Sequence, residues 1–277
     1  MSDVERSMTG FSAAMTPAET AAIDAGLRAY MLRVYNYMVI GLAITGCAAL
    51  VIYALSVAHD LSDATHVVRA GRAIPIPAGL AVQSRDVLLT DIGYWVFVSP
   101  LKWAIILAPL GLVLALSFGV ERMRPATAQW LFWVYAALVG LSLGVIFMVY
   151  THTAITRVFF VTAAAFGALS LWGYTSRRDL GGLGAFAIMG VVGVAVAGVV
   201  NLSLASSGLH WAISVVGVLA FAALTASDTQ RLKNEYLYAA LDGEMAERSA
   251  IVGALSLYLD FVNLFTLLLQ LTPQRDE

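Results

Sequence analysis

Charged residues are scarce in this sequence. Asp, Glu, Lys and Arg make up 12% of the 277 residues, whereas hydrophobic residues make up 60%, and the mean hydropathy is +0.82. This composition excludes an ordinary soluble domain and indicates that lipid is the solvent for most of the chain. The net charge of −2 also leaves no basic surface that could neutralise the phosphates of a nucleic acid. We therefore expect an integral membrane protein that contacts the lipid bilayer and binds no nucleic acid.

The sequence also has almost no cysteine and no recognisable cofactor-binding motif. Cys47 is the single cysteine, which excludes an internal disulfide and a cluster of thiolate metal ligands. The sequence has neither a P-loop nor a glycine-rich nucleotide fingerprint, so no bound cofactor is expected. The N-terminus lacks a basic segment that leads into a short apolar one, so we expect no cleaved signal peptide.

Long apolar segments are what the sequence does contain. A helix of about 20 residues crosses the hydrocarbon core of a bilayer. Seven windows of about that length follow one another, at residues 31–58, 101–120, 127–150, 157–175, 182–204, 210–230 and 249–271. Isolated strands would leave backbone groups unpaired in lipid, so the predicted fold class is all-α, a polytopic membrane protein with seven transmembrane helices. Small residues at 190, 193, 197 and 198 further predict that a neighbouring helix approaches the fifth window closely.

The windows also divide the chain. Residues 1–30 form a predicted cytoplasmic N-terminal segment, residues 31–271 the transmembrane domain and residues 272–277 a short tail. Lys and Arg are denser in the segments on the N-terminal side, which places the N-terminus inside and the C-terminus outside. The sizeable extracytoplasmic loop, at 59–99, has an alternation of apolar and polar residues around Ile74–Pro77. That loop forms either an extended hairpin or no regular structure.

The last window, GALSLYLDFVNLFTLLLQL, carries Asp260 near its middle. An aspartate at the centre of a spanning helix costs about 2.5–3.5 kcal/mol on insertion scales, so it needs a partner, a water-filled cavity or a function. Ser256, Asp260 and Asn263 are spaced i, i+4 and i+7 and therefore share one helix face. This polar face is either a hydrogen-bonded stripe that joins helices or part of an ion or proton path, and we favour the path.

A second carboxylate, Asp228, stands near the end of the sixth window in FAALTASDTQRLKN. It is either an interfacial residue paired with Arg231 or Lys233, or the partner of Asp260. Two carboxylates on consecutive antiparallel helices can share one proton or hold one hard cation such as Ca²⁺. The predicted windows place Asp260 roughly 15 Å from the inner boundary and Asp228 much closer to it. Contact therefore requires a deeper sixth helix or a later start of the seventh.

Three segments resemble the Bax inhibitor-1 family, the transmembrane Bax inhibitor motif proteins, in its bacterial branch. They are LRAYMLRVYNYMVIGLAITG in the first window, TASDTQRLKN at the end of the sixth and ALSLYLDFVNLF in the seventh. The likeness extends over about residues 27–271. It implies a bundle in which two layers of three helices surround a central seventh helix, located in the bacterial inner (plasma) membrane.

The resemblance also implies a function, that of a pH-sensitive calcium leak channel. Its gate corresponds to Asp228 and Asp260, which would meet and bind calcium only transiently, and Ser256 and Asn263 would support them. An arginine that latches the gate in the closed state corresponds to Arg122 in FGVERMRP, with Arg124 as the alternative. Calcium ions or protons are then the small partners, and the sequence leaves any protein partner unidentified. The chain departs from the family in two longer loops, at 59–99 and 231–248, and lacks the basic C-terminal tail of animal members.

Other functions share parts of this pattern. An intramembrane aspartyl protease also uses two aspartates on adjacent helices, but its GxGD motif is absent here, so we expect no enzyme. A proton-coupled secondary transporter would use the same carboxylates as a relay, although only Pro109 clearly interrupts a window. A non-conducting regulator of another membrane complex is the third interpretation. Calcium flux into liposomes would distinguish the channel from that regulator.

Overall fold

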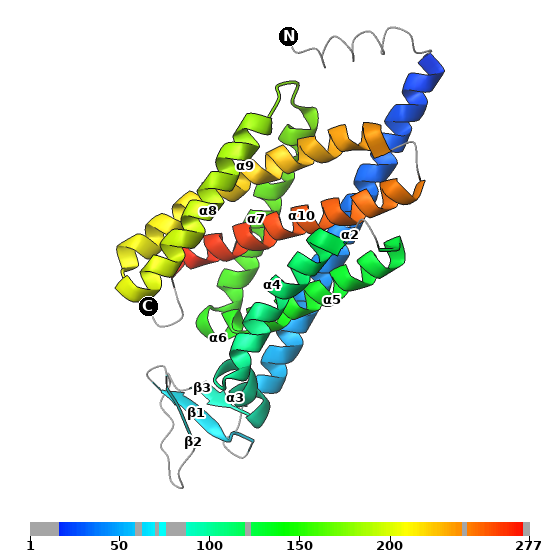
Figure 1. Cartoon of the computed structure of the whole chain (residues 1–277). Coiled ribbons are helices and arrows are strands. Elements are labelled where there is room, and N and C mark those ends of the chain that lie inside the picture. The colour runs from blue at the N-terminus through cyan, green and yellow to red at the C-terminus, as the bar shows by residue number, and fades with distance from the viewer. Residues whose placement is uncertain are drawn as a thin grey trace.

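The computed structural model describes residues 17–58, 63–69, 72–75, 87–119, 123–239 and 243–273, and helices make up most of them (Figure 1). The helices are α2 (Pro17–Ser56), α3 (Asp91–Phe97), α4 (Leu101–Gly119), α5 (Pro125–Leu143), α6 (Ile146–Val149), α7 (His152–Thr175), α8 (Gly181–Leu204), α9 (Ser207–Ala239) and α10 (Gly243–Gln270). The predicted all-α fold class is confirmed.

The long helices correspond to the predicted windows. Six spans are long and apolar enough to cross a membrane, namely those of α2, α5 with α6, α7, α8, α9 and α10. Helices α3 and α4 are bent against each other by 56° and make a seventh span if the pair is counted as one. Several helices outrun their windows: α2 begins at Pro17, α9 continues to Ala239, and α10 begins at Gly243. A helix satisfies its own backbone hydrogen bonds, so it can continue past the point where the apolar sequence ends.

Helix α10 lies at the centre of the bundle. In its membrane window 56% of the residues are buried, whereas the windows of the other five spans are 11–33% buried. It packs against α2 and α5 on one side and against α7 and α9 on the other, while α4 covers α5 and α8 covers α9 (Figure 1). Two groups of three helices, α2–α4–α5 and α7–α8–α9, therefore enclose a central helix, as predicted.

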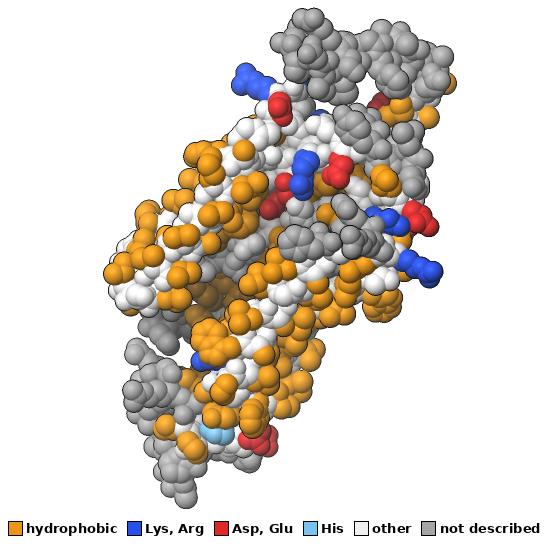
Figure 2. Space-filling view, viewed as in Figure 1, with side chains coloured by type: hydrophobic (Ala, Val, Ile, Leu, Met, Phe, Trp, Pro, Cys, Tyr) orange, Lys and Arg blue, Asp and Glu red, His pale blue; other side chains and the backbone are white. Residues whose placement is uncertain are grey.

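The outside of the bundle is apolar. Large hydrophobic side chains are exposed along the outer helices, and on α8 they include Phe186, Val199 and Leu202. Figure 2 shows hydrophobic side chains across the middle of the molecule, with most of the visible Lys, Arg, Asp and Glu side chains gathered toward one end. This distribution is typical of a protein whose middle lies in lipid.

A small antiparallel sheet lies at the end of the bundle where α2 finishes (Figure 1). Its strands β1 (His66–Arg69), β2 (Arg72–Pro75) and β3 (Val87–Leu89) are ordered β2-β1-β3. Its link to the helices includes the Ala58 N–H, which donates to the Leu88 carbonyl at 3.0 Å. Of the two predictions for this loop, the structure therefore agrees with the extended hairpin.

Candidate ion site between α9 and α10

Small residues bring α9 and α10 close together beside the two aspartates. A Cβ added to Gly253 of α10 would lie 2.5 Å from Cδ2 of Leu232 on α9, and Leu232 is 1% exposed. Only glycine fits this position without displacing Leu232. The close approach places Asp228 of α9 opposite Ser256 of α10.

Asp228 forms a closed set of contacts with Ser256 and Arg231. The Ser256 hydroxyl donates to Oδ2 of Asp228 at 2.5 Å. Nη2 of Arg231 lies 3.6 Å from Oδ1 of Asp228 and donates to the Ser256 hydroxyl oxygen at 3.3 Å. The Arg231 side chain is 58% exposed and that of Asp228 is 17% exposed, so this ion pair stands at the edge of the site and is partly screened by solvent.

Asp260 lies deeper, one helical turn beyond Ser256 along α10. It is 4% exposed, and among the described residues its buried Oδ2 has no hydrogen-bond partner. Within the described ranges, Asp228 and Arg231 are the charged groups that act on it electrostatically. Buried polar atoms are rarely left without partners, so an orphaned carboxyl oxygen inside the central helix is a functional signal.

The other predicted site residues lie apart from this cluster or outside the described part. The Asn263 amide donates to the Leu259 carbonyl of its own helix at 2.8 Å, and Lys233 donates to the Tyr174 carbonyl at 2.8 Å. Of the two cations considered for Asp228, Arg231 is thus the one in contact. Arg122 lies outside the described residues, and Arg124 is exposed directly before α5.

Asp228 does not lie at the end of its helix. Helix α9 continues to Ala239, eleven residues beyond Asp228, so this carboxylate lies about 16 Å from the helix end. Its neighbours on α9 fix the helix laterally. The Gln230 side chain accepts from the Leu180 N–H at 2.7 Å and donates to the Arg178 carbonyl at 2.7 Å.

A buried hydrogen-bond cluster that the sequence reasoning missed holds α10 on its other side. The Thr45 hydroxyl of α2 is 2.6 Å from the Tyr258 hydroxyl and donates to the Ala136 carbonyl of α5 at 2.9 Å. Tyr258 is fully buried and lies two residues before Asp260. A threonine and a tyrosine inside apolar windows were the available signal, but nothing in the sequence pairs positions 213 residues apart.

The donor set suits a transient cation better than a resident one. Among the described residues, no group of three or more His, Cys, Asp or Glu side chains could hold one metal ion. Ca²⁺ takes about 6–8 oxygen ligands, and two carboxylates with a hydroxyl supply only part of that number. Water would have to complete the shell.

These observations define a class: a polytopic α-helical membrane protein with an aspartate buried in its central helix and a second aspartate near it. The chain belongs to the Bax inhibitor-1 family, since the family model described as inhibitor of apoptosis-promoting Bax1 matches residues 27–277. The resemblance inferred from its motifs is confirmed.

Bacterial proteins of similar length show the same relationship. The chain is 38% identical to the inner membrane protein YbhL of Escherichia coli K12 over 253 residues, covering 91% of this chain and 94% of YbhL. It is 42% identical to an uncharacterized protein of Caulobacter vibrioides over 255 residues, covering 91% and 92% of the two chains. A protein of Rickettsia prowazekii is 38% identical over 260 residues, covering 94% and 95%.

Proposed function

We propose that this protein is a pH-sensitive calcium leak channel whose ion path passes Asp228 and Asp260. The observation that carries the proposal is the buried Oδ2 of Asp260, which has no hydrogen-bond partner in the described part of the chain although it belongs to the central helix. A carboxyl group that only joined helices would be hydrogen-bonded, because leaving it unpaired in an apolar surrounding is costly. An unpaired oxygen is instead available to a proton or a passing cation.

The contacts of Asp228 suggest how pH acts on the path. When Asp228 is ionised, it attracts Arg231, and with Ser256 the three side chains close the seam between α9 and α10. Protonation of Asp228 removes that attraction, so acidification loosens the seam and raises the leak. Loss of both negative charges would remove the anionic ligands that a cation needs.

The location and orientation are part of the proposal. The relative YbhL is named an inner membrane protein, which supports the bacterial inner membrane as the location. The excess of Lys and Arg on the N-terminal side supports a cytoplasmic N-terminus. We propose no enzymatic activity, and the latch role of Arg122 remains a prediction from the family resemblance.

Calcium flux into liposomes tests the channel proposal directly. The purified protein is reconstituted with a calcium dye inside, and flux is measured across a pH series. Flux through the parent should rise as the pH falls, whereas Asp228→Asn and Asp260→Asn should each flatten this response. Asp24→Asn is the matched control, because Asp24 is exposed on α2 away from the site. It should keep the parent profile.

Three results would contradict the proposal. If both site variants fold and keep the parental pH response, the aspartates are not the sensor. Absence of flux from every protein would favour a non-conducting regulator. Uphill calcium accumulation driven by an imposed pH gradient would indicate a proton-coupled transporter.

A further inference from the structure

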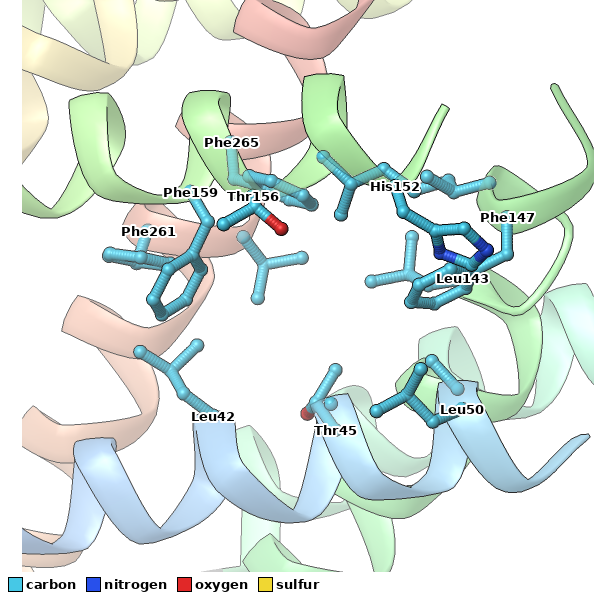
Figure 3. Close-up of a pocket in the computed structure, with 15 residues that line it drawn as sticks. Leu42, Thr45, Leu50, Leu143, Phe147, His152, Thr156, Phe159, Phe261 and Phe265 are labelled. Carbon is cyan, nitrogen blue, oxygen red and sulfur yellow. The ribbon is translucent and has the colours of Figure 1, made fainter. Parts of the chain in front are cut away.

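A crevice separates α2 from α7 on the half of the bundle nearer the small sheet. Both helices pack on α10, and between them lies a cavity of about 330 Å³. Figure 3 shows Leu42, Thr45 and Leu50 of α2 on one side of it and Thr156 and Phe159 of α7 on the other. Its volume lies at the lower end of the range of about 300–1,000 Å³ that is usual for small-molecule sites.

The walls of this crevice are apolar. Phe159 of α7 contacts Phe261 and Phe265 of α10, with ring centroids 5.7 and 6.4 Å apart. Leu50 is 50% exposed and Phe159 is 41% exposed, so the crevice opens on the outer surface of two membrane spans. Gly46 widens it, because a Cβ added there would meet nothing within 4 Å. Water is disfavoured in such a cavity, and at this depth the surrounding medium consists of acyl chains.

The end of the crevice toward the start of α7 is polar and cationic. A second cavity of about 420 Å³ adjoins it and is lined by His152, Thr153, Thr156 and Arg157. His152 and Thr156 line both cavities. Among the described residues no carboxylate lines either cavity, and Arg157 has no hydrogen bond or ion pair with a described residue. A guanidinium with two hydroxyls nearby is suited to a phosphate group.

We propose that this crevice binds one phospholipid with an anionic headgroup. One acyl chain lies between α2 and α7 against Phe261 and Phe265, and the phosphate lies beside Arg157. The occupant would contact α10 directly after Asp260, and it would also touch Thr45, which is hydrogen-bonded to Tyr258. The proposal does not depend on ion conduction.

Photo-crosslinking of a defined lipid tests the acyl-chain part. The full chain is reconstituted in vesicles of phosphatidylcholine and phosphatidylglycerol in equal amounts, with a trace of phosphatidylglycerol carrying a diazirine at the end of one acyl chain. After illumination, mass spectrometry should find the adducts concentrated on the crevice walls. Gly46→Trp places a large side chain in the open space of the crevice and should abolish these adducts. Gly193→Trp on the outer helix α8, where an added Cβ also meets nothing, should not.

The headgroup part is tested by competition. Arg157→Gln should lower the preference for labelled phosphatidylglycerol over labelled phosphatidylcholine by about fivefold, the effect of one basic residue at a membrane surface. Lys102→Gln, at the start of α4, is the matched control and should keep the preference. The proposal is overturned if adducts are as frequent on α8 as in the crevice, or if Gly46→Trp leaves the adduct pattern unchanged. If Arg157→Gln leaves the lipid preference unchanged, the proposal that the bound lipid has an anionic headgroup is wrong.

Discussion

Arg231 lies three residues after Asp228 on the same helix, yet it reaches across to α10 through Ser256. Because its side chain is 58% exposed, the ion pair adds little to stability, about 0–1 kcal/mol for pairs of this kind. The position of the Arg231 charge matters more than the stability that the ion pair contributes. It places a positive charge at the seam, close enough to act on Asp260, where it would repel a cation approaching the carboxylates.

Arg231→Gln should therefore raise the resting calcium leak at neutral pH. If the contact contributes about 1 kcal/mol to the closed state, the leak should increase about fivefold. The same liposome assay measures it, at matched protein levels. Arg33→Gln is the control, since Arg33 is exposed on α2 and is not part of the seam, and its loss should leave the leak unchanged.

The latch predicted at Arg122 is tested in the same series. If Arg122→Ala raises the leak and Arg231→Gln does not, the charge that closes the site comes from the second predicted span. If only Arg231→Gln raises it, the latch belongs to α9. Parental leak in both variants would mean that neither arginine closes the path.

At the scale of helices, close packing occurs at glycines that the sequence reasoning did not select. The small residues of α8 were predicted to admit a neighbouring helix, but added Cβ atoms at Gly193 and Gly198 would meet nothing within 4 Å. Of the three glycines in that prediction, Gly190 alone comes close to another helix, with its Cβ position 3.3 Å from that of Ala220. For Gly193 and Gly198 the prediction was wrong. Helix α8 is peripheral, so part of its small-residue surface faces outward.

Gly173 is the glycine on which the contact between α7 and α9 depends. A Cβ at this position would overlap the backbone carbonyl of Ala226, which lies two residues before Asp228. Gly173→Ala should therefore push the helices apart and lower the free energy of unfolding by about 1–3 kcal/mol, as overpacking does. Thermal unfolding in detergent measures this. Gly193→Ala should leave the midpoint nearly unchanged, and an equal midpoint for both variants would contradict the close contact.

Much of the helical architecture could be predicted from the sequence because apolar length alone defines a span. The ends of the helices could not be predicted, because α9 and α10 continue into polar sequence, where the apolar pattern no longer marks a boundary. The contact between Asp228 and Ser256 depends on these ends and on the packing of Leu232 against Gly253. The polar face of Ser256 and Asp260 was visible as a spacing, whereas the anchoring of Tyr258 by Thr45 required the three-dimensional arrangement.

The whole molecule has its basic residues mainly at one end. Successive spans alternate in direction, so the segments after α4, α7 and α9 lie at the same end as the start of α2 (Figure 1). The described basic residues near that end are Arg28, Arg33, Arg124, Arg177, Arg178, Arg231, Lys233 and Arg248. Lys102 and Arg157 lie toward the opposite end, with the small sheet. The positive-inside rule therefore predicts that the first end faces the cytoplasm.

This arrangement predicts the side of the membrane on which each end of the chain lies. A reporter that is active only in the cytoplasm should be silent when fused after Glu277, because α10 ends on the side of the sheet. The same reporter inserted between α9 and α10 should be active, which controls for expression and folding. Cytoplasmic activity at both positions would mean that α10 turns back within the bilayer. Activity after Glu277 with silence between α9 and α10 would instead mean that α3 and α4 do not form one crossing. In the first case Asp260 would not lie on a path between the two sides, which would contradict the channel proposal.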